Sequence, residues 1–201
     1  MEIINNKLEN PLKHYRELFA AADPQALAAR SSIPCTNGVF TIPFMNRTVR
    51  LKWPEMTGIY EDGSEVCGTN LILLARLVMN GVLAPNTGKM LSYPEMPWGP
   101  TYTAQFRGRC LNRLARTYGS SLEGFAAAAA SIGAKPAEGG DAAYDLEFVP
   151  GLIIRMILWA GDEEFGPSAQ VLFSENFQFA FSAEDIAVIG DIFLNAMKGR
   201  W

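Results

Sequence analysis

The sequence predicts an α+β fold: a single domain in which helices pack on one face of an antiparallel sheet. Strands are typically either continuously apolar or alternate between apolar and polar residues. Such stretches occur within residues 38–53, 143–160 and 168–173. Amphipathic and capped stretches before, between and after them are typical of helices. Because the composition does not change along the 201 residues, one globular domain over residues 1–201 is expected.

The first quarter of the chain predicts two helices and a hairpin. Residues 11–22 have the pattern of a helix. Asp23 followed by Pro24 starts a second, shorter helix, because Asp caps helices and Pro suits their first position. Residues 38–53 hold two apolar stretches around a turn, which is typical of a hairpin. Pro43 places the first of these strands at a sheet edge or a bulge, because proline lacks a backbone donor.

Helices dominate the middle of the chain. Residues 68–81 are apolar almost all round, which is typical of a buried helix. Residues 89–102 predict a short strand followed by a loop rich in proline and aromatic residues. Residues 103–119 predict an amphipathic helix. Its apolar stripe consists of Phe106, Cys110, Leu114 and Tyr118. Ser120 and Glu123 have the spacing of a capping box that opens the next helix.

The last third predicts three strands and a long helix. The strands are expected at residues 143–149, 152–160 and 169–173. The middle one is expected to be an inner strand because it is almost entirely apolar. Three acidic residues form the loop after it: Asp162, Glu163 and Glu164. Ser182 and Asp185 form a capping box that opens the final helix.

Composition argues against several classes of protein. The net charge of −4 and a pI near 5.1 argue against a nucleic-acid-binding module. Charged residues make up only 19% and apolar residues 49%, so much apolar surface must be hidden in a core, a ligand pocket or a homo-oligomer interface. The three cysteines, Cys35, Cys67 and Cys110, are far apart and form no Cys-x-x-Cys pair. No cysteine-ligated cluster is therefore expected.

The sequence predicts a cytoplasmic protein that does not enter a membrane. The N-terminal residues lack the cationic start and apolar stretch of a secretory signal. The longest apolar runs are interrupted by Arg76 and Arg155, and neither reaches the roughly 20 residues that a spanning helix needs.

The usual catalytic constellations are not found in the sequence. The single histidine, His14, lies between basic residues in the first helix, so a serine or cysteine hydrolase is not indicated. Residues 81–90 lack the spacing of a phosphate loop. Arg109, Arg113 and Arg116 share a helix face, which favours a solvated face over a phosphate site in so acidic a chain.

Arg155 is the most unusual residue of the predicted strands. Alternation puts it on the same face as Trp159, where its charge must reach water or pair with Asp145 or Glu147 on the preceding strand. The alternative is an anion-binding arginine beside an indole wall. The stiff aromatic loop would complete that pocket. The candidate ligand-binding residues are Arg155, Trp159, Trp98 and Tyr102.

The acidic loop is a candidate metal site. Asp162, Glu163 and Glu164 offer the hard oxygen ligands that magnesium and calcium prefer. Consecutive side chains in an extended loop point in different directions, however, so three adjacent acids rarely meet on one ion. The spacing by itself favours a hairpin tip in water, where charges also block edge-to-edge aggregation.

The C-terminal third contains a pattern of a proline before an apolar strand, then Trp-x-Gly-Asp-Glu-Glu-Phe, then Leu-Phe, then an acidic helix start. These residues are Pro150, Trp159, Gly161, Asp162, Glu163, Glu164, Phe165, Leu172, Phe173, Glu184 and Asp185. The pattern resembles the signature of an uncharacterised family, the domain of unknown function numbered three-seven-eight-six. The likeness spans roughly residues 10–197.

The resemblance implies a protein of anaerobic bacteria or archaea, and it implies no particular activity. Some family members carry an iron–sulfur-type cysteine segment ahead of the domain, but this sequence shows none, so no cluster is carried over. Ser174 stands where an Asp is usual after Leu-Phe. The motif leaves two interpretations of the acidic loop equally favoured: a structural turn in which Asp162 caps backbone amides, and a functional rim.

These observations favour a non-catalytic protein, either a small-ligand-binding domain or an accessory domain of anaerobic metabolism. The expected ligand is anionic or tetrapyrrole-like. Two alternatives stay open: a metal-dependent enzyme that uses the acidic loop, and an oligomerisation scaffold.

Overall fold

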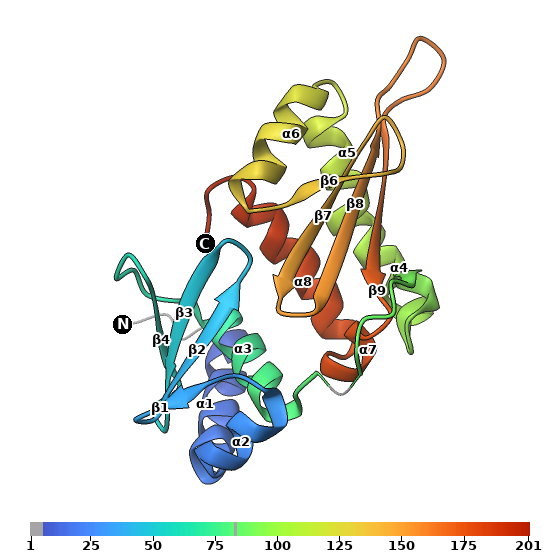
Figure 1. Cartoon of the computed structure of the whole chain (residues 1–201). Coiled ribbons are helices and arrows are strands. Elements are labelled where there is room, and N and C mark those ends of the chain that lie inside the picture. Colours follow the sequence, from blue (N-terminus) through green and yellow to red (C-terminus); the bar gives the residue numbers. More distant parts are fainter. Residues whose placement is uncertain (1–5, 83) are drawn as a thin grey trace. The chain divides into compact units, whose positions relative to one another are not determined.

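The computed structural model describes residues 6–82 and 84–201. The chain divides into two compact units, Met1–Leu83 and Ala84–Trp201. Each unit has an antiparallel sheet and its own helices, coloured blue to green in the first and green to red in the second (Figure 1). The α+β class is therefore confirmed. That residues 1–201 form a single domain stays a prediction.

The first unit combines helices with a four-stranded sheet in the order β1-β2-β3-β4. Its described elements are α1 (Asn6–Ala21), α2 (Pro24–Ser31), β1 (Cys35–Thr36), β2 (Val39–Phe44), β3 (Arg47–Lys52), β4 (Thr57–Tyr60) and α3 (Gly68–Asn80). Alternate residues of β2 and β3 are buried and the others are partly or fully exposed, so one face of this sheet carries the core.

Local sequence signals account for the elements of the first unit. The Asp23 carboxylate accepts hydrogen bonds from the backbone nitrogens of Gln25 and Ala26, at 3.2 and 3.3 Å, and caps α2. Pro43 lies in the part of β2 that β1 does not reach, because β1 pairs only with Val39 and Phe40. β2 itself lies between β1 and β3 and pairs with β3 in continuous register, so the predicted edge strand or bulge is wrong. Pro43 is tolerated because the short β1 does not reach it.

The second unit has a five-stranded sheet in the order β5-β9-β8-β7-β6. Its strands are β5 (Met90–Ser92), β6 (Lys135–Ala137), β7 (Ala142–Val149), β8 (Leu152–Trp159) and β9 (Ser168–Ser174). Its helices are η1 (Tyr93–Glu95), α4 (Gly99–Phe106), the π-helix η2 (Arg107–Leu111), α5 (Asn112–Tyr118), α6 (Leu122–Ser131), α7 (Phe177–Ala180) and α8 (Ala183–Ala196).

Strand β8 lies between β7 and β9, which confirms the predicted inner strand. Four of its side chains are fully buried on one face: Leu152, Ile154, Met156 and Leu158. Helices α5 and α6 contact the sheet, and α8 packs against α4 and η2; α5 and α8 run behind the sheet in Figure 1. Arg155 and Trp159 lie on the opposite face, so in this unit helices cover one face as predicted.

The predicted stripe is confirmed, but its helix differs from the prediction. Phe106, Cys110, Leu114 and Tyr118 are all buried. The helix begins earlier than predicted, at Gly99, and widens into the π-helix η2 before α5. Much of the predicted loop is therefore helical, because prolines suit the first positions of helical turns in both η1 and α4.

Of the two predicted capping boxes, one is wrong and one is confirmed. Ser121, not Ser120, caps α6, and its hydroxyl accepts the backbone N–H of Gly124 at 3.0 Å. The true cap lies one residue later because the chain becomes helical only at Leu122. At α8, Ser182 and Asp185 satisfy each other's backbone N–H groups as predicted.

Candidate functional site

Arg155 forms a two-point ion pair with Asp145. Its Nε and Nη2 donate to the two carboxylate oxygens at 2.7 and 2.8 Å, and the two residues face each other in the register of β7 and β8. The hydrogen bonds to Asp145 raise the pKa of Arg155, and the charge of Glu138 adds to that effect. Arg155 thus has the acidic partner on the preceding strand that was one of the two alternatives.

Trp159 ends β8 on the same sheet face and is 37% exposed. Ile157 lies between it and Arg155, and the loop around Gly140 packs on Ile157. That loop is held in place because Asp141 accepts a hydrogen bond from the backbone nitrogen of Ala160 at 2.8 Å. The face between Arg155 and Trp159 is therefore covered by the chain itself.

Trp98 and Tyr102 lie at the start of α4, on the helix-covered side of the sheet. Trp98 is 80% exposed, and Tyr102 is half-buried. Trp98 and Tyr102 therefore belong to one end of α4, and Arg155 and Trp159 lie four residues apart on one face of β8, so the two pairs are on different sides of the sheet.

A small pocket of ≈ 80 Å³ opens beside Trp98. Its lining includes Met96, Pro97, Trp98, Gln178, Phe181 and Ile186. Apolar side chains dominate this lining, and none of its residues is charged. The other side of the pocket could not be predicted from the sequence, because its residues lie about 80 positions further along the chain. Gln178 belongs to α7, Ile186 to α8, and Phe181 to the link between these two helices.

Tyr93 connects the segment before α4, which includes Trp98, to the beginning of α8. Its ring stacks on Phe106 with the ring centres 4.2 Å apart, and its hydroxyl donates to the backbone oxygen of Ala183 at 2.8 Å. Burial of this hydroxyl raises the pKa of Tyr93 to about 12. A Cβ on Gly99 would lie 2.0 Å from the backbone oxygen of Tyr93, so only glycine allows this close approach.

The backbone of Trp98 is left-handed, with φ 65°. A residue with a Cβ pays of order 1–3 kcal/mol for this conformation. The next residue, Gly99, lies close to the backbone of Tyr93, and the indole of Trp98 is exposed to water.

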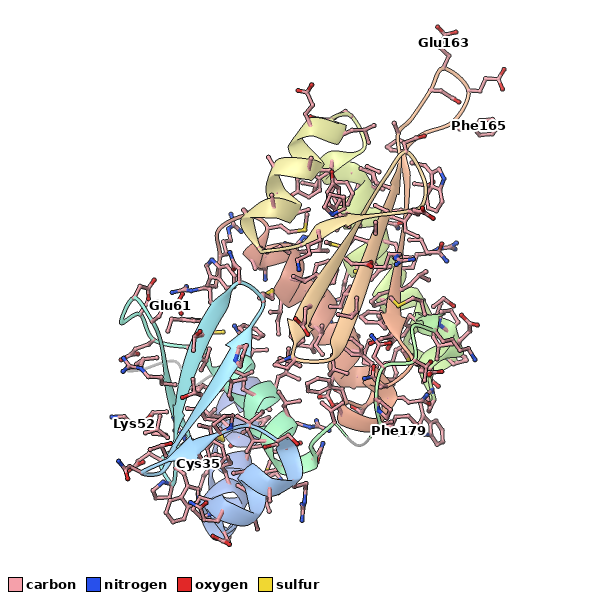
Figure 2. The ribbon with its side chains drawn as sticks, viewed as in Figure 1. Cys35, Lys52, Glu61, Glu163, Phe165 and Phe179 are labelled. Atoms are coloured by element: carbon pink, nitrogen blue, oxygen red, sulfur yellow. The ribbon has the colours of Figure 1, made fainter. Side chains whose placement is uncertain are left out.

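The acidic loop forms the tip of the β8–β9 hairpin. Oδ1 of Asp162 accepts the backbone N–H groups of Glu164 and Phe165 at 2.9 and 2.7 Å. These hydrogen bonds hold the pKa of Asp162 below its usual value. Glu163 and Glu164 are exposed, and Glu163 points away from the molecule (Figure 2). Asp162 thus makes the contacts of the structural turn.

Other residues considered in the sequence have structural partners. Arg109 and Arg113 pair with Asp191 on α8. Ser174 is fully buried, and its hydroxyl accepts the backbone N–H of Ile153 at 3.0 Å. Within residues 6–82 and 84–201, no three His, Cys, Asp or Glu side chains are grouped to hold a metal ion. Of the helices described, none is long and apolar enough to cross a membrane.

Comparison with curated proteins and with solved structures gave no match. The family model described as Domain of unknown function (DUF3786) matches residues 23–196, which is most of the chain. This match includes the Trp-x-Gly-Asp-Glu-Glu-Phe motif and the residues around the Trp98 pocket. The chain therefore belongs to the DUF3786 family.

Proposed function

We propose that this protein is a non-catalytic ligand-binding domain whose site is the pocket beside Trp98. The observation that carries the proposal is the 80% exposed indole of Trp98 next to a mainly apolar pocket. Burial of a large apolar side chain stabilises a protein by roughly 1.5–3 kcal/mol. Trp98 does not contribute this stabilisation unless a ligand covers its indole. Its left-handed backbone adds a further cost, and such costs are common at ligand sites.

The size of the pocket supports a small apolar group as its occupant. Pockets that enclose drug-sized molecules measure about 300–1,000 Å³, whereas this one measures ≈ 80 Å³. A single ring or a short aliphatic chain fits, with the rest of the ligand stacked on Trp98. A tetrapyrrole would reach the pocket only with its edge.

If the ligand is anionic, as the sequence leads us to expect, its charged group would bind at Arg155. An anion there would have to share the guanidinium with Asp145 and approach the negative charge of Glu138. Because both carboxylates oppose it, we propose the Trp98 pocket as the main site and the Arg155–Trp159 face as the secondary one.

An NMR titration with indole and n-butanol tests the proposal. The indole N–H signal of Trp98, assigned with Trp98→Phe, is expected to move on addition of these probes. Trp98→Ala is expected to weaken binding about tenfold, as loss of an aromatic anchor does. Trp159→Ala is the matched control and should leave the affinity unchanged. Equal loss in the two alanine variants would contradict the proposal.

We also propose that the protein is cytoplasmic, that it has an accessory role in anaerobic metabolism, and that it forms a homo-oligomer. The low fraction of charged residues and the exposed side chains of Trp98 and Phe179 support self-association. Sedimentation velocity tests it, and a single monomeric species over the whole concentration range would speak against an oligomer or a scaffold.

The second candidate is a metal-dependent enzyme at the acidic loop. It is favoured by the two exposed acidic residues that follow each other at the hairpin tip, Glu163 and Glu164. A cation that binds the folded form raises the melting temperature. If magnesium, calcium or manganese acts there, the rise should occur in the wild type and vanish in Glu163→Gln/Glu164→Gln. No rise with any of the three would exclude this candidate.

A further inference from the structure

The connection between β8 and β9, residues 160–167, projects beyond the end of the sheet as an arm (Figure 1). Its turn is closed by backbone and side-chain hydrogen bonds. The backbone nitrogen of Asp162 donates to the oxygen of Phe165 at 2.9 Å, and the Asp162 carboxylate accepts the N–H groups of Glu164 and Phe165. Asp162 therefore has a structural role in shaping the arm.

The base of the arm is packed against the unit that carries it. Pro167 lies so close to Gly119, at the end of α5, that a Cβ on Gly119 would be 2.1 Å from the Pro167 Cβ. Pro167 also packs against Gly161 on the other side of the arm. Because its base and its turn are both held, the arm loses little conformational entropy when it binds.

The arm presents one aromatic ring and two carboxylates to solvent. Phe165 is 70% exposed, and Figure 2 shows Phe165 and Glu163 on the projecting arm. Glu164, between them in the sequence, is exposed as well. An exposed phenylalanine has roughly 1.5–3 kcal/mol of burial available to a partner. Aromatic residues on a fixed support are typical anchors of protein interfaces.

The charge of the surroundings indicates the nature of the partner. Residues 84–201 contain 13 acidic and nine basic residues and so carry the whole net charge of −4, whereas residues 1–83 are neutral. The negative charge of the second unit favours a basic surface over a second, equally acidic copy as the partner of the arm.

We infer that the arm docks into a partner protein, with Phe165 in an apolar pocket and Glu163 and Glu164 against lysine or arginine side chains at its rim. This interaction is independent of the Trp98 pocket, which lies elsewhere in the unit. The residues of the arm thereby have two roles, because Asp162 shapes the turn and the next three residues make the contacts.

Fluorescence anisotropy with a dye-labelled amphipathic peptide of lysine and leucine tests the inference on the full chain. The peptide offers an apolar face bordered by positive charge, so it should bind the wild type and weaken as salt is added. Phe165→Ala is expected to bind about tenfold more weakly. Glu163→Gln/Glu164→Gln should also bind about tenfold more weakly and lose most of the salt dependence.

Two control variants test whether binding requires the arm itself or only an exposed aromatic ring or an exposed negative charge anywhere on the protein. Phe179→Ala removes another exposed phenylalanine, at 47% exposure, and Glu123→Gln removes another exposed acid. Neither should change the affinity. The inference is overturned if the wild type does not bind the peptide, or if Phe179→Ala weakens binding as much as Phe165→Ala. Circular dichroism verifies that all variants fold.

Discussion

Asn176 shows how one buried amide joins distant parts of the second unit. It is 1% exposed, and its Nδ2 donates to the backbone oxygens of Ala84 and Gly151 at 3.2 and 2.9 Å. Among the described residues, its Oδ1 has no hydrogen-bond partner. The first residue of the unit and the β7–β8 turn are thus tied to the start of α7 by one donor group.

Asn176→Asp is expected to destabilise the protein by about 3 kcal/mol. The substitution replaces a donor with a buried carboxylate that faces two carbonyl oxygens. Asn86→Asp is the matched control, because the exposed Asn86 uses its Oδ1 to accept the N–H of Gly88 and an aspartate keeps that acceptor. Urea unfolding measures both variants, and similar midpoints would contradict the role of the Asn176 amide.

At the scale of elements, the packing of α5 against the arm depends on the absence of a side chain at Gly119. The backbone of Gly119 has φ −64°, which any residue adopts. Glycine is therefore required there by close contacts with Pro167 and with the backbone oxygen of Ala115, and not by its own φ.

Gly119→Ala is expected to cost about 1–3 kcal/mol of stability, because the new methyl group must displace Pro167 and the base of the arm. Gly108→Ala, in η2, is the control: its Cβ would meet nothing within 4 Å, and alanine favours a helix by about 0.5–1 kcal/mol over glycine. Thermal unfolding distinguishes the two variants. Hydrogen exchange of the arm should rise only in Gly119→Ala.

At the scale of the whole molecule, each unit has its own sheet and its own buried residues. Residues 84–201 are long enough to bury a core without disulfides. We expect this fragment, produced alone, to unfold cooperatively on heating. Circular dichroism tests it, and a gradual, non-cooperative loss of signal would instead favour the predicted single domain over residues 1–201.

Much of the local structure was predicted because it depends on neighbours in the chain. The Asp23 and Ser182 caps lie within three residues of the amides that they bind. The buried stripe from Phe106 to Tyr118 follows from helical spacing, even though the π-helix was not predicted. The cap of α6 was misplaced by one residue because two adjacent serines have the same capping chemistry.

The sequence by itself determined the α+β class and the inner position of β8, because hydrophobic period acts over a few residues. It left the acidic loop open between a structural turn and a functional rim, and the structure shows Asp162 accepting the N–H groups of Glu164 and Phe165. Only the tertiary structure decided that Arg155 pairs with Asp145 rather than Glu147, since strand register sets that choice. It also decided that Trp98 faces a pocket completed by Phe181 and Ile186. Residues more than 80 positions apart in the chain meet there through packing, which no local pattern encodes.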